Sequence, residues 1–179
     1  MNALNQHLYF RKAESTDAPA IAMLINSAYR GESSRAGWTT EADILEGLRT
    51  SAKDVQLLIE SENSMILICL DGNDLLGAIC LEKALGAVHL GMFVVNPILQ
   101  GKGLGKKLLN TAEKLAQQVW DAEKLQMHVI SIRYELIAFY ERRGYQRTGV
   151  LSDFPVNPSV WQPKREGLRL ETLEKIIKC

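Results

Sequence analysis

The chain has 179 residues, of which 46% are hydrophobic and 23% are charged, and its 21 basic residues balance 21 acidic ones. This composition is typical of a globular protein with one core, so we expect a single domain over residues 1–179. The net charge is zero, and no apolar run approaches the roughly 20 residues of a membrane helix. We therefore expect neither nucleic acid nor a membrane as a partner.

The three cysteines, Cys69, Cys80 and Cys179, are odd in number and too widely spaced for a C-x-x-C pair or a metal site. Cys69 and Cys80 lie within apolar runs, so we expect them to be small core residues rather than reactive thiols. The N-terminus lacks the basic and then apolar layout of a signal peptide. These features favour a cytoplasmic protein that binds no metal.

The first part of the chain predicts a short strand over 8–14 and two helices, over 15–30 and 39–50. Asp17 can cap the first helix, and Pro19 suits its first turn. The polar loop between the two helices contains two glycines and two aromatic residues.

Apolar runs separated by turn residues then predict three strands, over 65–70, 75–83 and 87–95. The Asp71-Gly72 turn favours a hairpin, and the three strands should form an antiparallel meander.

The rest of the chain alternates helices with strands. The expected elements are a helix over 104–120, a strand over 124–130, a helix that starts near Arg133 and is stopped by Gly144, a strand over 145–150, a proline-rich loop over 151–167 and a strand over 168–176. This order predicts a mixed α/β fold with an antiparallel front half.

A glycine-rich turn joins the strand that ends near Val95 to the helix that begins near Leu104. The turn contains three glycines and three lysines, Gly101, Gly103, Gly105, Lys102, Lys106 and Lys107. Free N–H groups at a helix start, the helix dipole and bare backbone all favour a phosphate group. Gln100 can hydrogen-bond such a phosphate or the turn itself.

Two common phosphate-binding motifs do not fit this turn. The dinucleotide motif G-x-G-x-x-G fails because position 106 is lysine. The P-loop motif fails because position 100 is glutamine and because Lys106 is followed by Lys107 rather than by serine or threonine.

The segment Q-G-K-G-L-G after F-V-V-N-P resembles the Q/R-x-x-G-x-G/A segment of the GNAT superfamily of N-acetyltransferases, with Gln100, Gly103 and Gly105 at the matching positions. A second segment, A-F-Y-E-R-R-G-Y, is similar to the family signature F-Y-x-x-x-G-F/Y. Its matching residues are Phe139, Tyr140, Gly144 and Tyr145. The order of the expected elements resembles that of the family from residue 8 to about residue 174.

This resemblance implies an α/β fold with a central mixed, mostly antiparallel sheet of six to seven strands flanked by about four helices. It also implies acetyl-CoA as the acyl donor and direct transfer of the acetyl group to a primary amine in a ternary complex. The expected cofactor-binding residues are Phe93, Val94, Val95, Gln100, Gly101, Lys102, Gly103, Leu104, Gly105, Lys106 and Arg133. Arg133 stands where the family often has asparagine, and it is either a phosphate contact or a solvated arginine.

Tyr140 aligns with the general-acid tyrosine of the family, and a phenol with a pKa of about 10 is protonated at neutral pH. His89 is the candidate base, since an imidazole can deprotonate an amine directly or through water. Glu82 is a weaker candidate, and water alone can also take the proton. The resemblance implies that a backbone N–H near the end of the 87–95 strand binds the oxyanion.

The acceptor site is expected in the two loops least like a generic core. The candidate substrate-binding residues are Tyr29, Arg30, Glu32, Arg35, Trp38, Phe154 and Trp161. Glu32 can hold an ammonium, and Arg30 or Arg35 can hold a carboxylate, which would favour a small zwitterionic amine. A protein or peptide acetyltransferase and a non-catalytic acyl-CoA sensor are the alternatives, and a homodimer is common in the family.

Overall fold

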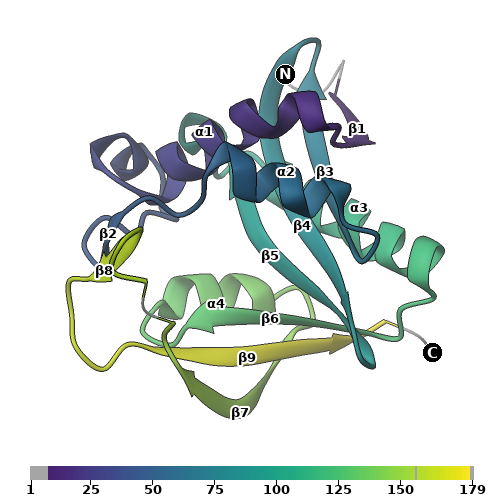
Figure 1. Cartoon of the computed structure of the whole chain (residues 1–179). Coiled ribbons are helices and arrows are strands. Elements are labelled where there is room, and N and C mark those ends of the chain that lie inside the picture. Colours follow the sequence, from purple (N-terminus) through teal and green to yellow (C-terminus); the bar gives the residue numbers. More distant parts are fainter. Residues whose placement is uncertain (1–7, 156, 178–179) are drawn as a thin grey trace.

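The computed structural model describes residues 8–155 and 157–177. Seven strands form the central sheet in the order β1-β3-β4-β5-β6-β9-β7 (Figure 1). In that order they are β1 (Leu8–Lys12), β3 (Ser64–Asp71), β4 (Asp74–Ala84), β5 (Ala87–Val95), β6 (Lys124–Ile130), β9 (Arg169–Ile176) and β7 (Gln146–Asp153). All neighbouring pairs are antiparallel except β5 with β6, which confirms the mixed, mostly antiparallel sheet expected from the sequence.

Four α-helices cover the two faces of the sheet (Figure 1). They are α1 (Ala18–Tyr29), α2 (Ala52–Glu60), α3 (Leu104–Trp120) and α4 (Tyr134–Glu141). Alternate side chains of β3 point to opposite faces of the sheet. Ile66 and Ile68 pack with α1 and α2, whereas Leu67 and Cys69 pack with α3 and α4. None of these described helices is both long and apolar enough to cross a bilayer.

The prediction of a helix over 39–50 is wrong. The chain instead makes turns there and forms β2 (Leu45–Gly47), which pairs with β8 (Trp161–Pro163) inside the loop expected after residue 150. Gly47 has a φ of 91°, and a Cβ there would lie 2.1 Å from the carbonyl oxygen of Val160. This close approach fixes an extended pairing that a helix could not make.

The second helix, α2, lies further along the chain and starts at a capping box. The Asp54 amide donates to Ser51 Oγ at 3.1 Å, and the Ser51 amide donates to Asp54 Oδ2 at 3.1 Å. This reciprocal pair satisfies two amides of the first helical turn.

Strand β5 separates from β6 after two paired residues, Val88 with Leu125 and His89 with Gln126. Cys80 of β4 lies opposite Gly91, and Ala78 lies opposite Val94, so one residue of β4 faces two of β5. This is a β-bulge, and it contains Met92 at a φ of 43°. The bulge bends the second half of β5 away from β6, and the two strands diverge as Figure 1 shows.

Candidate active site

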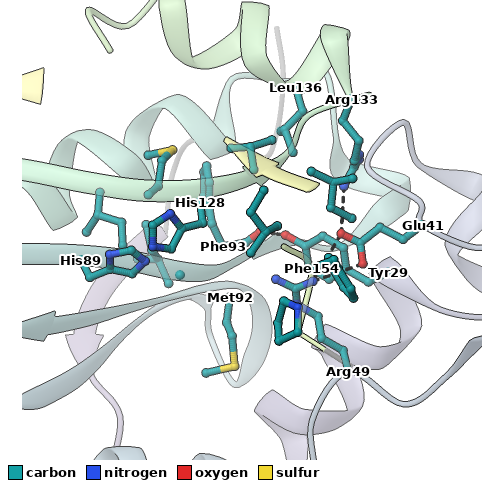
Figure 2. A pocket seen from close by; sticks show the side chains of 18 of the residues that line it. Tyr29, Glu41, Arg49, His89, Met92, Phe93, His128, Arg133, Leu136 and Phe154 are labelled. Atoms are coloured by element: carbon teal, nitrogen blue, oxygen red, sulfur yellow. Dashed lines mark hydrogen bonds and ion pairs between the residues drawn. The ribbon is translucent and has the colours of Figure 1, made fainter. Parts of the chain in front are cut away.

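Two cavities lie where β5 and β6 diverge. The glycine-turn cavity, of about 350 Å³, is bounded by the turn before α3 and by α4. The arginine cavity, of about 340 Å³, is bounded by the bulge, β6 and the loops around residues 30–49 and 154–161 (Figure 2). Four residues line both cavities, Tyr29, Phe93, Leu136 and Tyr140. Groups held in the two cavities can therefore meet at these four side chains.

The backbone of the glycine turn is suited to an anionic group. Gly101 and Gly103 have φ values of 78° and 84°, and a Cβ added at either would meet nothing within 4 Å. The surface above them is thus open, while the backbone adopts a conformation that favours glycine. The start of α3 presents main-chain N–H groups there, and Lys106 lines the cavity. These features fit the pyrophosphate of a coenzyme.

The Gln100 side chain bonds the protein itself. Its Oε1 accepts from the Trp38 amide at 2.9 Å, and its Nε2 donates to Thr39 Oγ1 at 2.8 Å and to the Val95 carbonyl at 3.1 Å. It therefore ties the loop at residues 38–39 to the end of β5. Trp38 packs on Phe139, with ring centroids 5.5 Å apart, and lines the glycine-turn cavity. Trp38, an expected substrate-binding residue, thus does not line the arginine cavity.

The side chains of the remaining expected cofactor residues point in different directions, and only some of them face the glycine-turn cavity. Phe93, Val95 and Gly105 line the glycine-turn cavity. Val94 points to the opposite face and packs with α1, and Leu104 is buried in the core, so only their main-chain atoms can face a ligand. Lys102 is exposed and does not line the cavity.

Tyr140 is buried on α4 at the junction of the two cavities. The end of α4 is fixed by Gly144, which has a φ of 88°, and by the Tyr145 amide, which donates to the Tyr140 carbonyl at 3.2 Å. The ring contacts Phe139 edge-on, with centroids 5.3 Å apart. Burial raises the pKa of the Tyr140 phenol above its usual value, so the hydroxyl is protonated at neutral pH.

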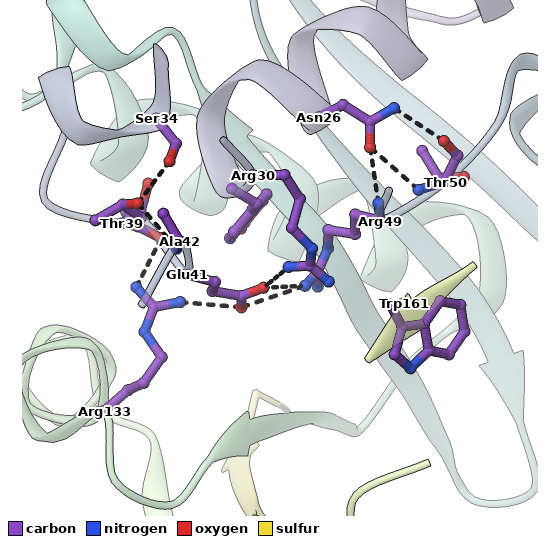
Figure 3. A network of polar contacts seen from close by, with 12 residues as sticks. Asn26, Arg30, Ser34, Thr39, Glu41, Ala42, Arg49, Thr50, Arg133 and Trp161 are labelled. Atoms are coloured by element: carbon purple, nitrogen blue, oxygen red, sulfur yellow. Dashed lines mark hydrogen bonds and ion pairs between the residues drawn. The ribbon is translucent and has the colours of Figure 1, made fainter. Parts of the chain in front are cut away.

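Glu41 lies at the centre of a polar network on the arginine cavity (Figure 3). It is only 3% exposed and accepts hydrogen bonds from Arg30, from Arg49 Nη1 at 3.1 Å and from Arg133 Nη1 at 3.1 Å. Burial would raise the pKa of Glu41, but the three guanidinium groups outweigh it and hold that pKa below its usual value.

Arg133 does not lie beside the glycine turn, where it would have to be to contact a phosphate as expected. Besides its bond to Glu41, it donates from Nη2 to the Thr39 carbonyl at 2.8 Å, and it lines the arginine cavity rather than the glycine-turn cavity. Its side chain is 8% exposed, so it is not a solvated arginine either.

Arg49 and Tyr29 connect this network to the bulge. The guanidinium carbon of Arg49 lies 4.3 Å from the centroid of the Tyr29 ring. The Tyr29 hydroxyl donates to the Phe93 carbonyl in the bulge. The network and the junction of the two cavities are therefore in direct contact.

The expected acceptor residues lie in two different places. Tyr29, Arg30, Phe154 and Trp161 line the arginine cavity. Glu32 and Arg35 instead pair with each other at 3.1 Å on the surface and line an outer groove, apart from the arginine cavity.

Among the lining residues of the arginine cavity that the sequence does not predict are Glu41, Arg49, Met92 and His128. Glu41 and Arg49 fall in the wrongly expected helix, where they resemble solvated charges. No local signal marks the other two residues.

His89 lies at the far end of the arginine cavity, beside His128 (Figure 2). The ring centroids are 4.5 Å apart. Burial and the neighbouring His128 lower the pKa of His89 to about 4, so the ring is neutral at pH 7. Three residues of β5 separate it from Phe93 at the junction.

Comparisons with known proteins agree with this architecture. The model of the acetyltransferase (GNAT) family matches residues 20–145, which is more than half of the chain. No curated protein sequence matches the chain.

Several solved structures share the fold. The ribosomal-protein-S18-alanine N-acetyltransferase from Escherichia coli has a TM-score of 0.70 at 15% identity, over 96% of this chain and 95% of that one. The acetyltransferase yncA from Salmonella typhimurium, solved with its cofactor acetyl-CoA, has a TM-score of 0.70 at 18% identity, over 97% and 95%. The spermidine/spermine N-acetyltransferase SpeG from Vibrio cholerae has a TM-score of 0.68 at 18% identity, over 97% and 95%. The family match and the shared fold together establish that the chain belongs to the GNAT family of acetyltransferases.

Proposed function

We propose that this protein transfers an acetyl group from acetyl-CoA to a primary amine of a small molecule, by direct transfer in a ternary complex. The observation that carries the proposal is the junction, where Tyr140 and Phe93 line two separate cavities at once. One cavity would hold the acyl donor, and the other would hold the amine. The family match supports acetyl-CoA as the donor, and yncA, which shares the fold, was solved with that molecule.

The glycine-turn cavity would hold acetyl-CoA. Its pyrophosphate would bind the N–H groups around Gly101 and Gly103, with Lys106 adding positive charge. The pantetheine arm would run along β5 into the gap beside β6. The thioester would then lie at the bulge, next to Phe93 and Tyr140.

The reaction requires one nucleophile, one oxyanion donor and one acid. The amine nitrogen attacks the thioester carbonyl, and a main-chain N–H at Phe93–Val95 would stabilise the oxyanion. When the carbon–sulfur bond breaks, the Tyr140 hydroxyl would give its proton to the departing thiolate. The attacking nitrogen loses one proton, which returns through solvent to the tyrosinate. The acetyl group ends on nitrogen, and free CoA leaves.

We propose that water takes the proton of the amine. His89 lies beside His128 at the end of the arginine cavity opposite Glu41, and its pKa of about 4 makes it a weak base at neutral pH. Glu82 lines the same distant end of the cavity. The solvent in the arginine cavity is therefore the nearer acceptor.

The size of the arginine cavity supports a small acceptor. Its volume of about 340 Å³ is within the usual range for small-molecule sites. The name of SpeG, spermidine/spermine N-acetyltransferase, shows that this fold can act on small amines.

Thermal unfolding with acetyl-CoA, CoA, ATP or NADH tests the donor. A ligand at about 100 times its Kd adds roughly 2.7 kcal/mol, which raises the melting temperature by roughly 5 to 10 °C in a chain of this size. We expect a shift with the two CoA species alone. Mass spectrometry of a panel of amines incubated with acetyl-CoA then tests transfer. No shift with either CoA species would contradict the proposal, as would CoA binding without any acetylated amine.

A further inference from the structure

The arginine cavity carries more positive than negative charge at the end that holds Glu41. The carboxylate of Glu41 is the acidic partner of Arg30, Arg49 and Arg133, and within the described residues none of the three has a second acidic partner. One carboxylate thus serves three guanidinium groups. Two positive charges in a largely buried place are left for another anion.

Among the residues that the structure describes, both Arg30 and Arg49 lack hydrogen-bond partners for part of their guanidinium groups. Arg30 is 7% exposed, and the Nε groups of Arg30 and Arg49 are buried with no hydrogen-bond partner in the described part of the chain. Burial lowers the pKa of Arg30 even beside Glu41, which shows that this carboxylate does not fully offset the loss of water. Arg133 has fewer hydrogen-bond donors left for a ligand, because it already donates to Glu41 and to the Thr39 carbonyl.

Arg49 is held in position before any ligand binds. Its main-chain amide donates to Asn26 Oδ1 at 2.8 Å (Figure 3). Its guanidinium lies over the Tyr29 ring. Tyr29 in turn bonds the Phe93 carbonyl at the junction. A ligand group on Arg49 is therefore close to the point where the two cavities meet.

We propose that the amine acetylated by this protein also carries a carboxylate, and that Arg49 and Arg30 bind this carboxylate at the Glu41 end of the arginine cavity. The inference rests on the proposed acetyl transfer and deepens it by naming the substrate class, an amino acid or a similar amino carboxylate. The carboxylate binds to guanidinium groups at the Glu41 end, and the amine then points to the thioester at the junction. Carboxylates suit this site because guanidinium groups bind them through paired, charge-assisted hydrogen bonds.

The test compares the twenty common amino acids with their primary amides, which keep the shape and lose the charge. Acetylation is followed as CoA release, and binding is followed as thermal unfolding in the presence of CoA. Losing a hydrogen bond to a charged group costs on the order of 10- to 100-fold in affinity, so kcat/KM for a preferred acid should exceed that for its amide by about this factor.

The Arg49→Gln variant separates recognition from structure. It should reduce kcat/KM for the acid by about 10- to 100-fold more than kcat/KM for the amide, so the preference disappears. Arg49→Lys, which keeps the charge, should restore part of it. Arg11→Gln is the matched control. Arg11 lies on the edge strand β1, away from both cavities, and the substitution removes its ion pair to Asp17. It should keep the full preference.

Three results would overturn the inference. One is equal or better acetylation of the amides, which would leave the proposed acetyl transfer intact. Another is an equal loss for acid and amide in Arg49→Gln, which would indicate a structural role only. The third is CoA binding with no amino acid that either stabilises the complex or is acetylated. If the CoA species themselves do not bind, it is the proposed acetyl transfer that fails.

Discussion

The substitution Gly103→Ala isolates the contribution of the glycine turn to cofactor binding. Gly103 has a φ of 84°, and the added Cβ would meet no atom within 4 Å. The folded protein would therefore suffer backbone strain without a clash, which costs about 1 to 2 kcal/mol for a residue in the left-handed region. The melting temperature should fall by roughly 2 to 8 °C.

A matched control exists in the turn between β4 and β5. Gly86 has a φ of 75°, and its added Cβ also meets nothing within 4 Å. Gly86→Ala should lower the melting temperature by a similar amount, because the same strain is introduced. It lies away from the glycine-turn cavity, so it should not change cofactor binding.

The two variants should differ only with ligand present. In Gly103→Ala the methyl group covers the open backbone and the strained turn can relax, so CoA should bind at least about tenfold more weakly, which corresponds to about 1.4 kcal/mol. Isothermal titration with CoA measures this directly, beside unfolding without ligand. The reasoning is refuted if Gly103→Ala binds CoA as tightly as Gly86→Ala does.

Three further predictions follow from single side chains. Gln100→Leu loses three hydrogen bonds and should destabilise the fold by about 2 to 4 kcal/mol in urea unfolding, whereas a loss below about 0.5 kcal/mol would show that this anchor is unimportant. The folded-state pKa of His89 is about 4 against 6.5 for the free side chain, so the unfolded chain gains the proton first and stability falls as the pH drops through that window. Between pH 6.5 and pH 4, the free energy of unfolding should fall less in His89→Gln than in the wild type. Parallel plots of the free energy of unfolding against pH for the two proteins would contradict this. Burial raises the pKa values of Cys69 and Cys80 to about 11 and 12, so in a Cys179→Ser background both thiols should react with a thiol reagent at pH 8 only after unfolding. Rapid labelling of the folded protein would contradict the burial.

Most of the central sheet could be predicted from the sequence, because its signals are local. The meander from residue 65 to residue 95 follows apolar runs broken by turn residues, and α3 follows helical periodicity after the glycine turn. The capping box at Ser51 and Asp54 is an equally local signal for α2, although the expected second helix lies over 39–50.

The arginine network could not be predicted in the same way. Arg30, Glu41, Arg49 and Arg133 are separated by up to 103 positions in the numbering, and only the fold brings them to one cavity. A lone charged residue in the sequence is usually solvated, so nothing local distinguishes Glu41 from Glu32. Burial distinguishes them, since the first is 3% exposed and the second lies on the surface.

The divergence of β5 from β6 has no local signal in the sequence. Its physical cause is the bulge at Met92, where a residue other than glycine takes a positive φ. No turn signal in the sequence marks that position, because methionine rarely adopts such a conformation.

The steady-state rate of Tyr140→Phe tests the central claim most directly. The hydroxyl makes no hydrogen bond to another residue within the described ranges, so the variant should melt at nearly the wild-type temperature and bind acetyl-CoA normally. Without a proton for the departing thiolate, kcat at saturating acetyl-CoA and amine should fall by about 100- to 10,000-fold. An unchanged kcat in a folded, CoA-binding variant would contradict acetyl transfer at the junction of the two cavities with Tyr140 as the acid.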